Sequence, residues 1–156
     1  MSIATRLKWV LESNQVEYEI IAHEHTSSSL ASAKAAHVPT GRVAKCVLLE
    51  DERGYILAIV PASCRVAIDA IGETTGRNLE LATEPELEGI FTDCERGAIP
   101  PFGAQTPLPM VVDESLLRLP DIYFEAGDHE GLVHVSGEAF KSLCGDMRQG
   151  RFSRLH

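Results

Sequence analysis

One lysine stands inside a segment that otherwise has the composition of a buried strand. Lys45 lies within the run Val43-Ala44-Lys45-Cys46-Val47-Leu48-Leu49, and strand alternation places it on the face opposite Ala44 and Cys46. Two interpretations stay open: a solvent-facing lysine on an edge strand, or a cation that projects from a rigid strand into a cleft. In a cleft, the ammonium group could hold a carbonyl, a phosphate or a developing oxyanion.

A glycine- and proline-rich loop is the second candidate for chemistry. In the run Gly97-Ala98-Ile99-Pro100-Pro101-Phe102-Gly103, two glycines frame two prolines. Proline stiffens the backbone, and glycine permits a ligand to approach backbone N–H groups closely. The loop is either a rigid connection or the wall of a binding site, and the residues alone leave both open.

Clustered polar residues form the third candidate, in the loop Ala126-Gly127-Asp128-His129-Glu130-Gly131. Its Asp, His and Glu could supply a general base or orient a water, or could simply form a polar hairpin loop. The run Thr26-Ser27-Ser28-Ser29 offers helix caps or a row of hydroxyls along a cleft. The histidines show no standard spacing for a metal site, so no metal is predicted.

Hydrophobic periodicity predicts the elements that must position these residues. Strands outnumber helices and occur in runs, which favours an α+β domain built on a mixed, largely antiparallel sheet over a doubly wound one. We expect one domain over residues 1–156. Helices are expected at 5–14, 30–36, 66–75, 84–90 and 137–143, and strands at 16–22, 42–50, 55–60, 79–81, 110–112, 122–124 and 132–135.

Composition and charge exclude several classes of protein. The 156 residues, 44% hydrophobic and 24% charged, are those of a globular domain. No apolar run approaches the roughly 18–20 residues that span a bilayer, and the first residues lack a secretory signal pattern, so a cytoplasmic location is expected. Four dispersed cysteines indicate reduced thiols. The net charge of −9 argues against broad binding of nucleic acid, except through a local rim, for which the candidates are Arg42, Lys45, Arg65 and Arg77.

Taken in order, these segments resemble the YbaK/prolyl-tRNA synthetase insertion-domain family of aminoacyl-tRNA deacylases. The matching stretches are residues 23–28, 44–49, 97–103, 109–115 and 124–129, and the resemblance extends from about residue 16 to residue 143. It implies a compact α+β domain with a mixed, barrel-like sheet surrounded by helices. It also implies an enzyme that hydrolyses the ester of a mischarged aminoacyl-tRNA without a metal or an organic cofactor.

The resemblance further implies a free-standing trans-editing hydrolase, because no synthetase core accompanies the domain. The expected substrate is the acceptor end of a tRNA that carries a small amino acid, with Ala, Ser, Thr and Cys all open. An aminoacyl-tRNA synthetase is a second candidate partner, and monomer and homodimer are both compatible with the sequence.

Site residues follow from the same resemblance. Lys45 matches the family's active-site lysine, Gly97 and the loop after it match the border of the aminoacyl pocket, and Gly127 matches the glycine loop near the scissile ester. At Glu125, Asp128 and His129 the best-described branches have other residues. The predicted catalytic set is Lys45, Gly97, Gly127, Asp128 and His129, and the predicted substrate-binding set is His25, Thr26, Ser28, Pro100, Pro101, Phe102 and Gly103.

Our hypothesis for the reaction is electrostatic. Lys45 anchors the terminal phosphate or the reacting region, backbone N–H groups at Gly97 or Gly127 receive the oxyanion, and water or the ribose hydroxyl moves the proton. Two alternatives remain. One is a non-catalytic module of the same fold that binds a nucleotide or an aminoacyl ligand, and the other is a metal-dependent hydrolase that uses His23, His25 and His129.

Overall fold

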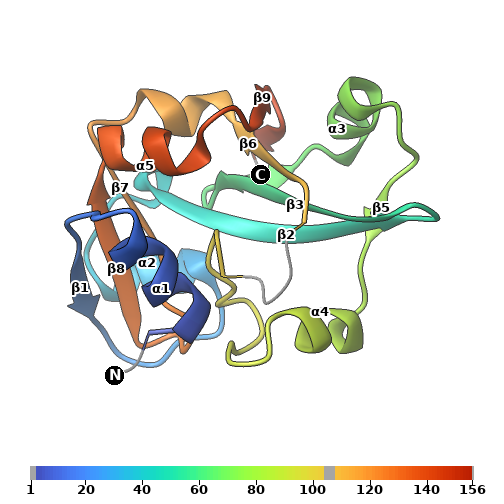
Figure 1. The fold of residues 1–156 in the computed structure, drawn as a ribbon. Helices are drawn as coiled ribbons and strands as arrows, with labels where there is room; N and C mark the ends of the chain where they lie inside the picture. Colours follow the sequence, from blue (N-terminus) through green and yellow to red (C-terminus); the bar gives the residue numbers. More distant parts are fainter. Residues whose placement is uncertain (1–2, 104–107, 156) are drawn as a thin grey trace.

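A mixed sheet runs through the middle of the computed structural model, which describes residues 3–103 and 108–155 (Figure 1). The strand order is β1-β8-β7-β2-β3-β6-β9, with β5 also paired to β2, and β4 and β10 form a separate ribbon. Three pairs are parallel, β2 with β7, β3 with β6, and β6 with β9. The strands are β1 Glu19–Ala22, β2 Val43–Asp51, β3 Gly54–Pro61, β4 Cys64–Val66, β5 Glu80–Leu81, β6 Met110–Asp113, β7 Asp121–Glu125, β8 Gly131–Ser136, β9 Arg148–Gly150 and β10 Ser153–Leu155.

Helices surround the sheet on several sides. The helices α1, α2 and α5 gather around the half of the sheet that contains β1, β7 and β8, whereas α3 and α4 flank the far end of the β2–β3 hairpin (Figure 1). No described helix has the length and apolar character that crossing a bilayer requires. The α-helices are α1 Thr5–Ser13, α2 Ser29–Ala35, α3 Ile68–Thr75, α4 Glu84–Ile90 and α5 Gly137–Cys144, and short 3-10 turns occur at Thr40–Arg42 and Glu114–Arg118.

This architecture confirms the predicted α+β class with a mixed sheet and flanking helices. Every predicted helix and strand is present, although the first strand begins three residues later than expected, at Glu19. The strands β4, β9 and β10 were not predicted. Each has only three residues, which is too short for an alternating pattern to stand out.

The long β2–β3 hairpin is the element that positions the predicted lysine. Its register pairs Lys45 with Val60 and Cys46 with Ile59, so successive side chains face opposite sides of the sheet. Near the turn, the Asp51 carboxylate accepts hydrogen bonds from the Arg53 N–H at 2.8 Å and from Arg77 Nε at 2.7 Å. The hydrogen-bonded Arg77 guanidinium holds the pKa of Asp51 well below its usual range, and the pair ties the turn to the segment after α3.

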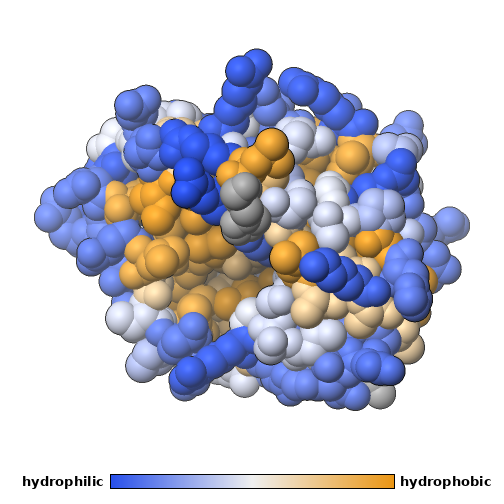
Figure 2. All heavy atoms as spheres, turned by 180° about the vertical axis from the view of Figure 1, so that it is seen from behind, coloured by the Kyte–Doolittle hydropathy of each residue, from blue (hydrophilic) through white to orange (hydrophobic). Residues whose placement is uncertain are grey.

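The main core lies between the sheet and the helices α1 and α5. Phe124 of β7 and Phe140 of α5 are fully buried, with ring centroids 6.5 Å apart, and Leu7 and Leu11 of α1 belong to the same cluster. Not all apolar surface is covered. Figure 2 shows apolar residues gathered in a hollow on the opposite face of the molecule from Figure 1, with hydrophilic residues around it.

Two glycines provide a matched test of this packing. At Gly137, the first residue of α5, an added Cβ would lie 2.0 Å from the Leu119 carbonyl oxygen, whereas at Gly89 in α4 it would meet nothing within 4 Å. We expect Gly137→Ala to lower the free energy of unfolding by about 1–3 kcal/mol or more. Gly89→Ala should raise it by about 0.5–1 kcal/mol, because alanine loses less entropy in a helix. Urea denaturation measures both, and equal effects would contradict the packing described for α5.

Candidate functional site

Lys45 opens onto a cavity of about 320 Å³ where three segments of the chain meet. The start of α2, the hairpin through β2 and the residue after β3, and the loop at Gly97 contribute its walls. The lining residues are Ser28, Ser29, Leu30, Lys45, Cys46, Ala62 and Gly97. The structure therefore brings together Lys45, Gly97 and Ser28, three of the residues that the sequence singles out.

The Lys45 ammonium is held at this cavity without a counter-ion. Its side chain is half-buried, and burial lowers its pKa, with partial opposition from the nearby Cys64 thiol. In the described part of the chain no carboxylate lies within ion-pair distance of it. A partly desolvated and unpaired cation interacts more strongly with an incoming anion or carbonyl than a hydrated one does.

Gly97 occupies a position that other residues would strain. Its φ is +76°, and an added Cβ would lie 3.1 Å from the Ser27 carbonyl oxygen and 3.3 Å from His129 Nε2. Ser29 Oγ lies 3.4 Å from the Gly97 carbonyl oxygen. The absence of a side chain therefore lets this loop pack closely against the segment before α2 and against His129.

His129 is buried, and both of its ring nitrogens are occupied. Nε2 donates to the carbonyl oxygen of Arg96, and Nδ1 lies 3.1 Å from Glu125 Oε2. Burial alone would lower the pKa of His129, but the hydrogen bonds to Glu125 and Arg96 and the charge of Glu125 together raise it. With both nitrogens engaged inside the protein, the ring is arranged as a structural link and not as a group free to take a proton from water.

A second hollow of about 650 Å³ is lined by Arg96 and by the two residues before it. His25 and Thr26 line it, and His25 Nε2 contacts Glu95 Oε2 at 2.7 Å. Thr26 Oγ1 lies 2.6 Å from Ser32 Oγ, so the Thr26 hydroxyl is hydrogen-bonded to a side chain of α2. Ser28 caps α2 by accepting from the Ala31 N–H at 3.1 Å, and it also lines the Lys45 cavity.

The remaining predicted site residues lie elsewhere. Gly127, with φ +124°, packs on the start of α1, where an added Cβ would be 3.2 Å from Ala4 Cβ. The Phe102 ring packs against Phe124 and Phe140 in the main core. Pro100, Pro101 and Gly103 are buried beside it, and Asp128 Oδ1 accepts from the Glu130 N–H at 2.9 Å. None of these five loop residues, nor Gly127, is among the residues that line the Lys45 cavity.

Glu125, Ser29 and Ser32 were not in the predicted sets, although the structure places them next to the site. Ser29 and Ser32 donate to Glu125 Oε2 at 3.3 Å and 3.0 Å. The sequence carried a signal for the two serines only. The two serines are three residues apart on one helix face, but nothing in the sequence brings Glu125 to them.

The structure does not favour the metal hydrolase. Among residues 3–103 and 108–155 no group of three or more His, Cys, Asp or Glu side chains is arranged to hold a metal ion. Of the candidate ligands, His25 contacts Glu95, both ring nitrogens of His129 are occupied, and His23 keeps a buried nitrogen, Nε2, without a hydrogen-bond partner among the described residues.

Comparison with known proteins agrees with this description. Residues 23–143 match the model of the aminoacyl-tRNA editing domain, so the chain belongs to that family. It is 27% identical, over 128 residues, to the Escherichia coli K12 multifunctional Ser/Thr-tRNA deacylase ProXp-y, with 78% of this chain and 76% of that protein covered.

Solved structures share the fold. A candidate trans-editing enzyme for prolyl-tRNA synthetase superposes with a TM-score of 0.83 at 23% identity, covering 97% of this chain and 96% of that one. The hypothetical protein APE2540 superposes with a TM-score of 0.85 at 18% identity, covering 96% of this chain and 99% of that one.

The burial of Lys45 is directly measurable. We expect the Lys45 side chain, followed by NMR in protein with labelled lysine, to titrate below the usual pKa of a lysine, because burial disfavours its charged form. Lys45→Met assigns the resonance. Because the pKa of Lys45 is lower in the folded state than in the unfolded state, its charge destabilises the folded protein at pH 7. The free energy of unfolding of Lys45→Met should therefore be no lower than that of wild type. Titration of Lys45 at the usual pKa of a lysine, or above it, would contradict the burial.

Proposed function

We propose that this protein is a free-standing aminoacyl-tRNA deacylase that hydrolyses the ester of a tRNA mischarged with a small amino acid. The observation that carries the proposal is that the unpaired Lys45 and Gly97 line one cavity, within a chain of the aminoacyl-tRNA editing family. The deacylase activity of the Escherichia coli relative supports it.

The proposed chemistry needs no protein nucleophile. Burial raises the pKa of the Cys46 thiol well above its usual range, so Cys46 stays protonated, and the Ser29 proton is engaged by Glu125 and Gly97. A water adds to the ester carbonyl, the bond to the ribose oxygen breaks, and the products are the free amino acid and a tRNA with its hydroxyl restored. Lys45 stabilises the negative charge that develops on the carbonyl oxygen, and the N–H of Gly97, which lines the same cavity, is the proposed backbone donor.

Substrate selection in this proposal rests on the size and polarity of the cavity. A closed wall rejects larger side chains more effectively than a pocket distinguishes two that differ by one methylene, which is worth about 1–3 kcal/mol. Ser28 and Ser29 bring hydroxyl groups to the wall. Together with the Ser/Thr-tRNA deacylase relative, they favour serine or threonine esters among the small amino acids.

The charges around the cavity favour a limited contact with the tRNA. Arg42 is ion-paired with Asp121 and Arg77 with Asp51, so neither of these two predicted rim residues offers a free charge. Arg65 in β4 is exposed and, within the described residues, has no ion pair. A few phosphate contacts near the acceptor end suit a protein with a net charge of −9.

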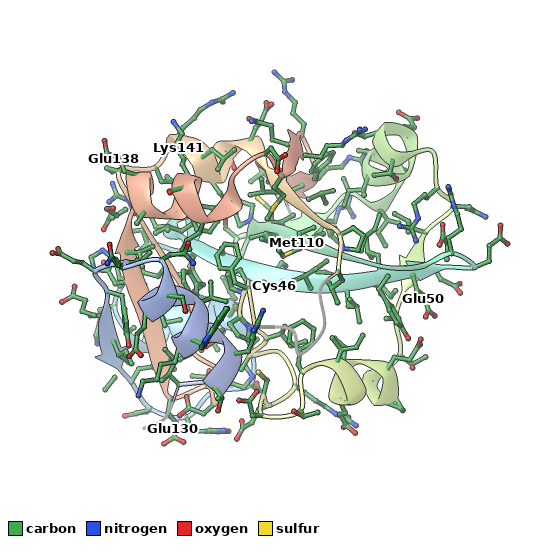
Figure 3. All side chains as sticks on the ribbon, viewed as in Figure 1. Cys46, Glu50, Met110, Glu130, Glu138 and Lys141 are labelled. Atoms are coloured by element: carbon green, nitrogen blue, oxygen red, sulfur yellow. The ribbon has the colours of Figure 1, made fainter. Side chains whose placement is uncertain are left out.

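The deacylase proposal is tested with tRNAs charged with Ala, Ser, Thr, Cys or Pro. We expect wild-type protein to release at least one small amino acid, and Lys45→Ala to release it about 100-fold more slowly or worse, the usual loss for one electrostatic stabiliser. Lys141→Ala is the matched control, because Lys141 projects from the outer side of α5, away from the middle of β2 where Cys46 lies (Figure 3).

Two outcomes contradict this account in different ways. Saturable binding of charged tRNA without release of any amino acid would support the binding module of the same fold. Equal rates for Lys45→Ala and Lys141→Ala would remove the lysine from the mechanism.

The limited phosphate contact is tested by salt dependence. We expect Arg65→Ala to weaken tRNA binding and to reduce the slope of log K against log salt concentration by about 1, the value for one lost phosphate contact. Arg118→Ala serves as the control, since Arg118 is exposed on the 3-10 turn Glu114–Arg118. Identical slopes for the two variants would exclude Arg65 from the interface.

A further inference from the structure

A buried polar cluster lies directly behind the wall of the Lys45 cavity. Its members come from α2, from the end of β7 and from the loop after β7, and all are almost inaccessible: Glu125 is 0% exposed, Ser32 0%, His129 1% and Ser29 6%. Ser29 belongs to the cluster and to the cavity wall at once. The cluster is therefore one side chain away from the space where the substrate is proposed to bind.

One carboxylate oxygen organises this cluster. Glu125 Oε2 is 3.3 Å from Ser29 Oγ, 3.0 Å from Ser32 Oγ and 3.1 Å from His129 Nδ1. The Arg96 carbonyl can only accept, so the proton on His129 Nε2 is fixed by that contact. Three donors converging on one oxygen fit an ionised carboxylate beside an imidazolium ring.

Two contacts lead from the cluster to the glycine loop. His129 Nε2 donates to the Arg96 carbonyl, and Ser29 Oγ lies 3.4 Å from the next carbonyl, that of Gly97. The single Ser29 proton is shared between Glu125 Oε2 and the Gly97 oxygen. The orientations of two successive peptide groups, at Arg96 and Gly97, thus depend on side chains that Glu125 holds in place.

Stability alone does not account for Glu125. The other carboxylate oxygen, Oε1, is buried and has no hydrogen-bond partner in the described residues. An unpartnered buried carboxylate oxygen destabilises a fold, and an apolar residue of similar volume avoids that cost. What the carboxylate provides is a fixed position for His129 and Ser29, the two side chains that contact the Arg96 and Gly97 carbonyl groups.

We propose that Glu125 is a positioning residue for the deacylation reaction: through His129 and Ser29 it fixes the Arg96–Gly97 backbone opposite Lys45 without contacting the substrate. The inference rests on the proposed function for its catalytic consequence. It also predicts a change in loop rigidity that can be measured whether or not the protein turns out to be a deacylase.

The test compares Glu125→Ala, Glu125→Gln and Ser29→Ala, with Glu130→Ala as the control. Glu130 is exposed on the same loop as His129 and points outward (Figure 3). Glutamine can place its amide oxygen at the position of Glu125 Oε2, where it still accepts from both serines and from the Nδ1–H of a protonated His129, so it preserves these links without the negative charge.

In single-turnover deacylation we expect Glu125→Ala to be slower by about 10- to 100-fold, the range for a misplaced catalytic group, with KM little changed. Glu125→Gln should recover to within about threefold of wild type, and Ser29→Ala, which loses one link, should fall between them. Amide hydrogen exchange at Ala98, whose N–H donates to the Glu95 carbonyl at 3.1 Å, should accelerate in Glu125→Ala and keep the wild-type rate in Glu125→Gln and Glu130→Ala.

The outcomes separate the two claims. If wild-type protein releases no amino acid, the proposed deacylase function fails, while the exchange rates still decide whether Glu125 positions the loop. A folded Glu125→Ala variant with wild-type exchange and turnover would overturn the inference. So would a Glu125→Gln variant as slow as Glu125→Ala with unchanged exchange. Should Glu125→Ala not fold, Ser29→Ala and Glu125→Gln give the same comparison.

Discussion

The site depends on one physical condition, a lysine ammonium held partly out of water with no carboxylate to neutralise it. Burial lowers the pKa of Lys45, which means that the charged ammonium slightly destabilises the folded protein at neutral pH. A long strand paired on both sides supplies the rigidity that this requires, because β2 contacts β3 along one edge and β7 and β5 along the other. Because no carboxylate of the described residues neutralises the ammonium, it can interact with a substrate.

At Gly97, the cavity wall is formed by backbone and not by a charged side chain. Gly97 has a backbone conformation and a close packing that exclude a side chain, and its peptide group is held by hydrogen bonds from buried side chains. Three segments far apart in sequence, near residues 29, 97 and 125, meet there. A fixed charge on a strand thus faces a fixed backbone loop, which is the arrangement that electrostatic stabilisation of an oxyanion requires.

Much of the fold follows from the sequence because its elements carry strong local patterns. The alternation in the β2–β3 hairpin and the periodicity of α5 are sufficient to place those elements. The residues that the loops contact in the folded protein could not be predicted from the sequence. Phe102 enters the aromatic core beside Phe140, and Gly127 packs on α1, because long-range packing decides where a loop residue lies.

The buried cluster shows the same limit. Ser29 and Glu125 are 96 residues apart, and each alone has the appearance of an ordinary polar residue. Only the topology that sets α2 against β2 and β7 makes them partners, and only then does His129 acquire its raised pKa.

The most direct test is a crystal structure with a non-hydrolysable 3′-aminoacylamino analogue of the terminal adenosine. The account predicts that the analogue's carbonyl group lies in the 320 Å³ cavity, within hydrogen-bonding distance of Lys45 Nζ and beside the Gly97 backbone. An analogue bound away from this cavity, or a Lys45 side chain turned into solvent in the complex, would contradict it.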